Sequence, residues 1–99
     1  MQHSILVFAV VEAAESDAEM VFSAVEHLAC QSRLEVGCAR YDVYRSREAP
    51  VRLIVHEGWK SSEALQAHRG SLHVEEFKKA ISGTTATVWA SQCELSRKT

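Results

Sequence analysis

The chain has 99 residues, of which 46% are hydrophobic and 24% are charged, and its formal net charge is −2. These values are typical of a single globular domain over residues 1–99 and exclude a disordered chain. Charges of both signs are spread without a basic stripe, and no apolar run approaches the roughly 18 residues of a membrane span, so neither nucleic acid nor a membrane is an expected partner.

The first predicted elements are a strand and a helix. Residues 5–11 form a short, continuous apolar run, which predicts a strand covered on both faces, with Phe8 on one of them. No basic segment precedes this run, so a strand is favoured over a targeting signal. The order Ser16-Asp17-Ala18-Glu19 has the form of a capping box, so we expect Ser16 to cap a helix that runs to about Ser32. Apolar side chains at helical spacing predict that one side of this helix is buried.

A second strand is expected over residues 38–45. Alternation places Ala39 and Tyr41 on the same face of this strand. The polar segment that follows contains Pro50, the single proline, and therefore predicts a loop.

The third predicted strand, over residues 51–59, carries a carboxylate within an apolar run. Alternation puts Glu57 on the same face as Val55 and Trp59, with His56 on the other face. A buried carboxylate must be paired or protonated, so Glu57 is expected to have an arginine, a histidine or a helix-start amide beside it. Trp59 is expected in the core or in a pocket wall.

Two helices follow the third strand. Ser61 or Ser62 can cap a helix over residues 63–69, and Gly70 marks its end. Ser71 can cap a third, shorter helix. The break between the two helices is therefore expected at the glycine and serine pair.

Strand-forming residues over 85–93 predict the last strand, ahead of a polar tail from about residue 94. The order β-α-β-β-α-α-β predicts a ferredoxin-like α+β sandwich, with helices on one face of an antiparallel four-stranded sheet. Because the first and third predicted strands are apolar on both faces, the sheet face without helices also needs a cover. A second copy of the chain is the simplest cover, so we expect a homodimer that pairs through the sheet face.

Two histidines flank the predicted break between the helices. His68 lies three residues after Leu65 and four before Leu72, so we expect it on the inner edge of its helix. It can serve chemistry there, or it can simply bond a backbone carbonyl. The spacing of five residues does not place His68 and His73 on one helical face, so a two-histidine metal site is not expected.

The cysteine content indicates the redox state of the cellular compartment. The chain has three cysteines, Cys30, Cys38 and Cys93. Their number is odd, and no Cys-x-x-Cys pair is present. Reduced thiols in the cytosol are therefore favoured over a disulfide framework, which predicts a cytoplasmic protein.

A longer pattern connects these elements. It consists of Glu35-x-Gly37-Cys38-x-Arg40-Tyr41-Asp42-x-Tyr44-Arg45, then Glu57-x-Trp59-Lys60-Ser61-x-Glu63-Ala64-Leu65-x-Ala67-His68, and then Ser71-x-His73-x-x-x-Phe77. In this pattern the chain resembles the antibiotic biosynthesis monooxygenase domain, a family of dimeric α+β barrels that includes quinol monooxygenases. The resemblance covers nearly the whole chain and is most specific between Glu57 and Phe77.

The resemblance implies a dimeric α+β barrel with a pocket between sheet and helices in each subunit. It implies oxygenation of a small aromatic or quinol-like substrate, with dioxygen as co-substrate and without a metal, flavin or haem. His68 would be the base, and Glu57 would hold it in one tautomer. The expected pocket residues, each of which can also be an ordinary core, strand or cap residue, are Tyr41, Trp59, His73, Phe77 and Phe8.

Two other functions remain open. The chain can be a non-catalytic dimeric module that binds a small apolar or aromatic ligand. It can also be an isomerase or lyase that acts on a small carbonyl compound, with Arg40 and Arg69 as anion contacts. Haem degradation fits less well, because Lys78 stands where related enzymes carry an axial histidine.

Overall fold

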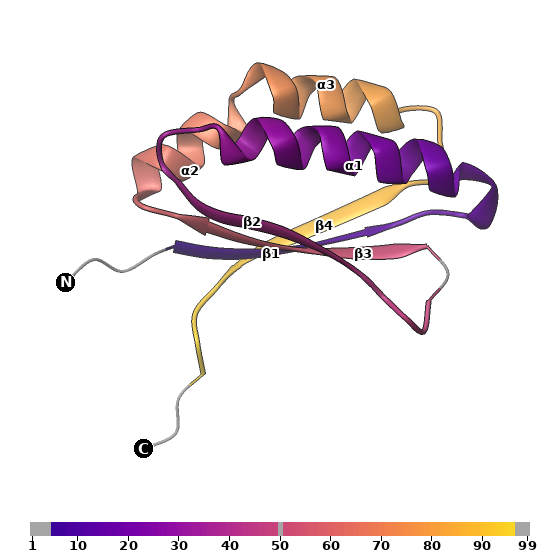
Figure 1. The fold of residues 1–99 in the computed structure, drawn as a ribbon, viewed down its shortest axis with the longest axis horizontal. Coiled ribbons are helices and arrows are strands. Elements are labelled where there is room, and N and C mark those ends of the chain that lie inside the picture. Colours follow the sequence, from indigo (N-terminus) through magenta and orange to yellow (C-terminus); the bar gives the residue numbers. More distant parts are fainter. Residues whose placement is uncertain (1–4, 50, 97–99) are drawn as a thin grey trace.

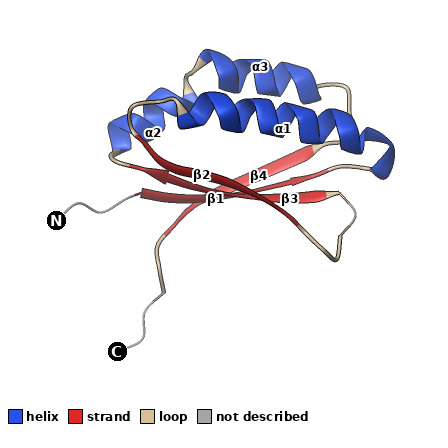
Figure 2. Ribbon diagram, viewed as in Figure 1, coloured by secondary structure: helices blue, strands red, loops and turns tan. Residues whose placement is uncertain are grey.

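Three helices cover one face of a four-stranded antiparallel sheet (Figures 1 and 2). The computed structural model describes residues 5–49 and 51–96. In the sheet the strand order is β2-β3-β1-β4. The predicted ferredoxin-like α+β fold is therefore confirmed. In chain order the elements are β1 (Ile5–Glu12), a 3₁₀ turn (Glu15–Asp17), α1 (Ala18–Arg33), β2 (Cys38–Arg45), β3 (Arg52–Trp59), α2 (Ser62–Arg69), α3 (Leu72–Ile81) and β4 (Thr87–Cys93).

The element bounds agree closely with the sequence patterns. β2 spans the predicted residues 38–45, and β3 begins one residue later than predicted. Alternation holds along β3, where Val55, Glu57 and Trp59 are all buried. Pro50, which marked the predicted loop, lies outside the described residues. None of the helices in the described ranges combines the length and the apolar character needed to cross a membrane.

The core lies between the helices and the helix-facing side of the sheet. The apolar side of α1 is buried, as its spacing predicts, and it belongs to the same cluster as the inward side chains of β1. Burial of apolar surface stabilises such a layer by roughly 25 cal/mol per Å². The members from these two elements are Val21, Val25, Leu28 and Ala29 of α1, and Val7, Ala9 and Val11 of β1.

The start of α1 differs from the prediction. Ser16 lies in the 3₁₀ turn, so the predicted capping box does not form. Asp17 precedes the helix, and its Oδ2 accepts hydrogen bonds from the amide of Thr85 at 2.8 Å and from the Thr85 hydroxyl at 2.6 Å. These hydrogen bonds lower the pKa of the Asp17 carboxyl. The turn before α1 is therefore held by a contact with Thr85, in the loop that precedes β4. Local sequence cannot reveal this contact.

A bulge interrupts β2 and corrects the predicted faces of this strand. Cys38 pairs with Trp59 and Arg40 pairs with Gly58, so Ala39 is an extra residue in the ladder. Ala39 is consequently exposed, whereas Tyr41 is buried. The prediction that these two side chains share a face was wrong, because a bulge shifts strict alternation by one residue.

The opposite face of the sheet carries no helix within the described part of the chain (Figure 1). Pairing register places Leu6, Phe8 and Val10 of β1 on this face, beside Ile54 of β3 and Trp89 of β4. Trp89 is 63% exposed. This apolar face is suited to an interface.

Candidate active site

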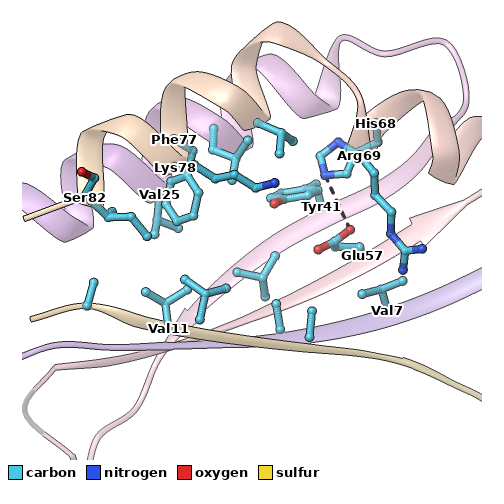
Figure 3. A pocket seen from close by; sticks show the side chains of 18 of the residues that line it. Val7, Val11, Val25, Tyr41, Glu57, His68, Arg69, Phe77, Lys78 and Ser82 are labelled. Atoms are coloured by element: carbon cyan, nitrogen blue, oxygen red, sulfur yellow. Dashed lines mark ion pairs between the residues drawn. The ribbon is translucent and has the colours of Figure 1, made fainter.

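A cavity of about 690 Å³ lies between the sheet and the helices (Figure 3). Its size is within the usual range of small-molecule sites. Most of its wall is apolar, contributed by valine, leucine, isoleucine and phenylalanine side chains. Figure 3 shows Tyr41, Glu57 and His68 together at one end. The cavity therefore combines an apolar chamber with a small polar group, which is the usual composition of a ligand site.

Glu35 connects the two histidines that flank the helix break. Its Oε2 lies 2.7 Å from Nδ1 of His68 and 2.7 Å from Nε2 of His73. An ionised carboxylate can only accept hydrogen bonds, so both nitrogens donate to it. Neutral His68 consequently carries its proton on Nδ1 and has a free lone pair on Nε2. That nitrogen is the one capable of accepting a proton.

The break between α2 and α3 brings the histidines together. The Ser61 hydroxyl caps α2 by accepting from the amide of Ala64 at 3.1 Å, and the Ser71 hydroxyl caps α3 by accepting from the amide of Val74 at 3.3 Å. Because the chain turns at Gly70, His68 and His73 belong to different helices, and their ring centroids lie 5.9 Å apart. The spacing rule used for one continuous helix does not apply to this pair.

Glu35 reaches the site because the connection from α1 to β2 packs tightly on α2. The carbonyl oxygen of Gly37 accepts a hydrogen bond of 2.9 Å from the amide of Lys60. A Cβ atom at Gly37 would lie 2.3 Å from the Cβ of Ala64, so the close approach requires glycine. Sequence reasoning missed the role of Glu35, although this residue begins the family pattern. It precedes the strand in a turn, where neither helical nor strand periodicity assigns a direction.

Glu57 does not make the orienting contact that the sequence suggested. Its Oε1 accepts a 2.9 Å hydrogen bond from Nε1 of Trp59 and lies 3.9 Å from Nε2 of His68, which is beyond hydrogen-bond distance. The orienting contact with His68 comes from Glu35 instead. Burial raises the pKa of the Glu57 carboxyl, although the Trp59 hydrogen bond and nearby His68 act in the opposite direction.

Two aromatic side chains surround the imidazole of His68. Trp59 is fully buried, and its ring centroid lies 4.4 Å from that of His68. It is not among the described residues that line the cavity, so it supports the site from behind. Tyr41 does line the cavity, at a centroid distance of 5.7 Å from His68. Burial, followed by the nearby Glu57 carboxylate, raises the pKa of the Tyr41 phenol well above its ordinary value, so the hydroxyl stays protonated.

The remaining expected pocket residues fall in three places. Phe77 lines the cavity. His73 contacts Glu35 and is not among the described lining residues. Phe8 lies on the opposite face of the sheet and stacks on His56, with ring centroids 4.5 Å apart. The expectation that Phe8 lines the pocket is corrected, because alternation along β1 turns its neighbour Val7 towards the helices instead.

Glu35, His68 and His73 also form a group that could hold a metal ion. Their ligand atoms lie within 4.8 Å of one another. Two imidazole nitrogens and one carboxylate oxygen suit zinc or iron. The same three atoms are joined by two hydrogen bonds, so the cluster satisfies its polar groups by itself.

Comparison with models of known protein families gave a match over most of the chain. The family model described as antibiotic biosynthesis monooxygenase matches residues 4–80. None of the curated proteins compared with this chain matches it.

Solved structures share the fold. A protein of Pseudomonas aeruginosa is 26% identical, with a TM-score of 0.87, over 97% of this chain and 98% of that chain. A candidate antibiotic biosynthesis monooxygenase from Deinococcus radiodurans is 20% identical, with a TM-score of 0.86, over 96% and 95%. Another candidate from Nitrosomonas europaea is 18% identical, with a TM-score of 0.81, over 94% and 92%. The last two are similar to this chain in fold alone.

Proposed function

Because the chain belongs to the antibiotic biosynthesis monooxygenase family, we propose that it is a monooxygenase that oxidises a small aromatic substrate, such as a quinol, with dioxygen. The observation that carries this proposal is the 2.7 Å hydrogen bond between Nδ1 of His68 and Glu35. This bond leaves Nε2 of His68 as a proton acceptor at the polar end of the cavity. Imidazole is a suitable base near neutral pH.

The proposed chemistry starts with removal of a phenolic proton by Nε2 of His68. The resulting anion is electron-rich and can pass an electron to dioxygen. With a hydroquinone, one oxygen atom enters the ring and the other leaves as water, so that a hydroxyquinone forms. The substrate supplies all four electrons that dioxygen takes up. The proposed reaction therefore uses no metal, flavin or haem.

The surrounding residues support this role. Tyr41 stays protonated and can donate a hydrogen bond to negative charge that develops on the substrate. The Glu57 carboxyl lies 3.9 Å from the nitrogen that gains the proton, so its negative form stabilises the imidazolium. The apolar wall keeps water away from the reacting anion.

We also propose that the functional unit is a homodimer. The apolar sheet face opposite the helices supports this assembly, since two copies packed through it would cover Phe8, Ile54 and Trp89. The cavity lies on the helix side of the sheet, so each subunit would keep its own site.

Oxygen uptake by the purified protein tests the proposed reaction. We expect consumption of dioxygen with a hydroquinone, and we expect His68→Ala to lower the rate by about 100-fold or more, because it removes the base. His27→Ala is the matched control, since His27 is an exposed histidine of α1, away from the cavity lining.

Other results would point to the alternative functions. No oxygen uptake across a broad panel of phenols would contradict the proposal. Turnover under anaerobic conditions would indicate an isomerase or lyase. Stabilisation by an aromatic ligand without any turnover would indicate a binding module.

A further inference from the structure

Two cationic side chains lie on the cavity wall. Arg69 is the last residue of α2, Lys78 lies in α3, and both side chains line the cavity while staying exposed to solvent. Figure 3 shows Lys78 extending from α3 towards the end of the cavity that holds Tyr41, and Arg69 extending from α2 towards the sheet. Both charges are therefore placed at the boundary between the apolar chamber and water.

The charges on this wall are not balanced. Glu57 is the only acidic side chain among the described residues that line the cavity. Within residues 5–49 and 51–96, neither Arg69 nor Lys78 forms an ion pair within 4.0 Å. The Arg69 guanidinium lies close enough to Glu57 to lower the pKa of that carboxyl. Among the described residues, Lys78 has no acidic partner at ion-pair distance.

Of the two adjacent lysines in α3, one lines the cavity. Lys78 and Lys79 are both exposed to solvent, but Lys78, like Phe77 before it, lines the cavity and Lys79 does not. The methylene chain of a lysine can lie along apolar surface while its ammonium group stays at the boundary with water. A ligand carboxylate at that boundary gains more from the ammonium group than it would in bulk water, because apolar walls lower the local dielectric constant.

We propose that the substrate is an aromatic acid, a phenol that carries a carboxylate, and that Lys78 binds this carboxylate with Arg69 as a weaker second contact. The ring occupies the apolar chamber, and the phenol lies within reach of His68. This inference rests on the proposed function for the reacting phenol. Binding of the carboxylate, however, can be measured without any turnover.

A matched pair of ligands tests the proposal. 4-Hydroxybenzoate and 4-hydroxybenzamide share the ring and the phenol and differ mainly in charge. Isothermal titration calorimetry at low salt is expected to show about tenfold tighter binding of the acid, the effect of a partly shielded ion pair. The preference is expected to weaken in 1 M sodium chloride, because salt screens the charges.

Substitutions at three positions assign the preference to particular side chains. Lys78→Met keeps the length and apolar character of the side chain, and we expect it to reduce the preference for the acid to about twofold or less. Arg69→Met is expected to reduce it by a smaller factor. Lys79→Met, the control, is expected to leave it unchanged. Lys78→Gln serves the same purpose if Lys78→Met folds poorly by circular dichroism.

Equal binding of the acid and the amide by the unchanged protein would overturn the inference. A preference that persists in both Lys78→Met and Lys78→Gln would also overturn it. If the acid is preferred but no phenol is oxidised, the carboxylate-binding site at Lys78 stands and the proposed function fails. If neutral quinols are oxidised and no carboxylate preference exists, the proposed function stands and the inference fails.

Discussion

At the scale of single residues, two carboxylates lie near opposite ring nitrogens of His68. Glu35 hydrogen-bonds Nδ1 of His68 and thereby sets which nitrogen carries the proton. Glu57 lies 3.9 Å from the other nitrogen and is buried, so in the proposed reaction it acts through its charge and not through a direct hydrogen bond. The two groups have different environments, because Glu35 bonds two histidines whereas Glu57 bonds the indole of Trp59.

The buried carboxyl of Glu57 predicts a stability that depends on pH. Its pKa is raised in the folded state, so the folded protein binds this proton more tightly than the unfolded chain does. The contribution of Glu57 to the free energy of unfolding is fully present below the pKa that this carboxyl has in the unfolded chain. It is lost as the pH rises through the higher pKa of the folded state. We therefore expect Glu57→Gln to be more stable than the unchanged protein at pH 8, because it removes a buried charge, and to show a smaller advantage at pH 4.

Urea unfolding of both proteins at these two pH values measures the difference. An advantage of Glu57→Gln that is larger at pH 4 than at pH 8 would contradict the assigned direction of the pKa. Oxidation of a hydroquinone is expected to slow in the same variant, since the imidazolium loses its nearby negative charge.

At the scale of elements, the site depends on a close contact between the turn before β2 and helix α2. Gly37 allows this contact, and Glu35 reaches the histidines from the same turn. The helix break at Gly70 and Ser71 then turns His73 towards that carboxylate. Each histidine is thus placed by its own helix, and the carboxylate is placed by a third segment.

Gly37→Ala is expected to destabilise the fold by about 1–3 kcal/mol, because the added methyl group overlaps Ala64 and α2 must move. We also expect slower oxidation of a hydroquinone, since the turn that carries Glu35 must shift. Thermal unfolding and oxygen uptake measure the two effects.

Gly70→Ala is the matched control for this substitution. A Cβ atom at Gly70 would meet only the carbonyl oxygen of Gln66, at 3.7 Å, and the backbone φ there is −94°. This variant is therefore expected to fold with nearly unchanged stability. Equal stability of the Gly37 and Gly70 variants would show that the close approach to α2 is not required.

At the scale of the whole molecule, the two faces of the sheet have different surroundings. The helix face forms the core and the cavity, whereas the other face presents apolar side chains that the described part of this chain does not cover. A domain of this length buries a limited share of its surface by itself, so the proposed interface on the second face would add stability.

Sedimentation at micromolar concentration is expected to give twice the 11.0 kDa mass of one chain. Phe8→Glu places a charge on the proposed interface and is expected to shift the equilibrium towards the monomer, because that charge would have to be buried. Met20→Glu is the control, since Met20 is an exposed apolar residue of α1. A monomeric mass for the unchanged protein would contradict the proposed dimer.

Local sequence predicted much of the fold because strands and helices follow short periodicities. Alternation placed Val55, Glu57 and Trp59 on the buried face of β3, and serine caps with a glycine stop located α2 and α3. The sequence also placed Glu57 and His68 on inward faces, and both line the cavity. These features depend on residues that are two to four positions apart.

Only the tertiary structure decided the contacts that join distant segments. The local pattern predicted Ser16 as the cap of α1, but Asp17 precedes this helix and is held by Thr85, 68 residues away. Glu35 lies 33 residues from His68, in a turn without periodicity, so no local pattern indicates that the two side chains meet. The sequence by itself therefore determined which side chains of α1 and β3 face inwards. The packing of the turn at Gly37 against α2 decided which carboxylate holds the histidine, because that contact depends on how separate elements fit together.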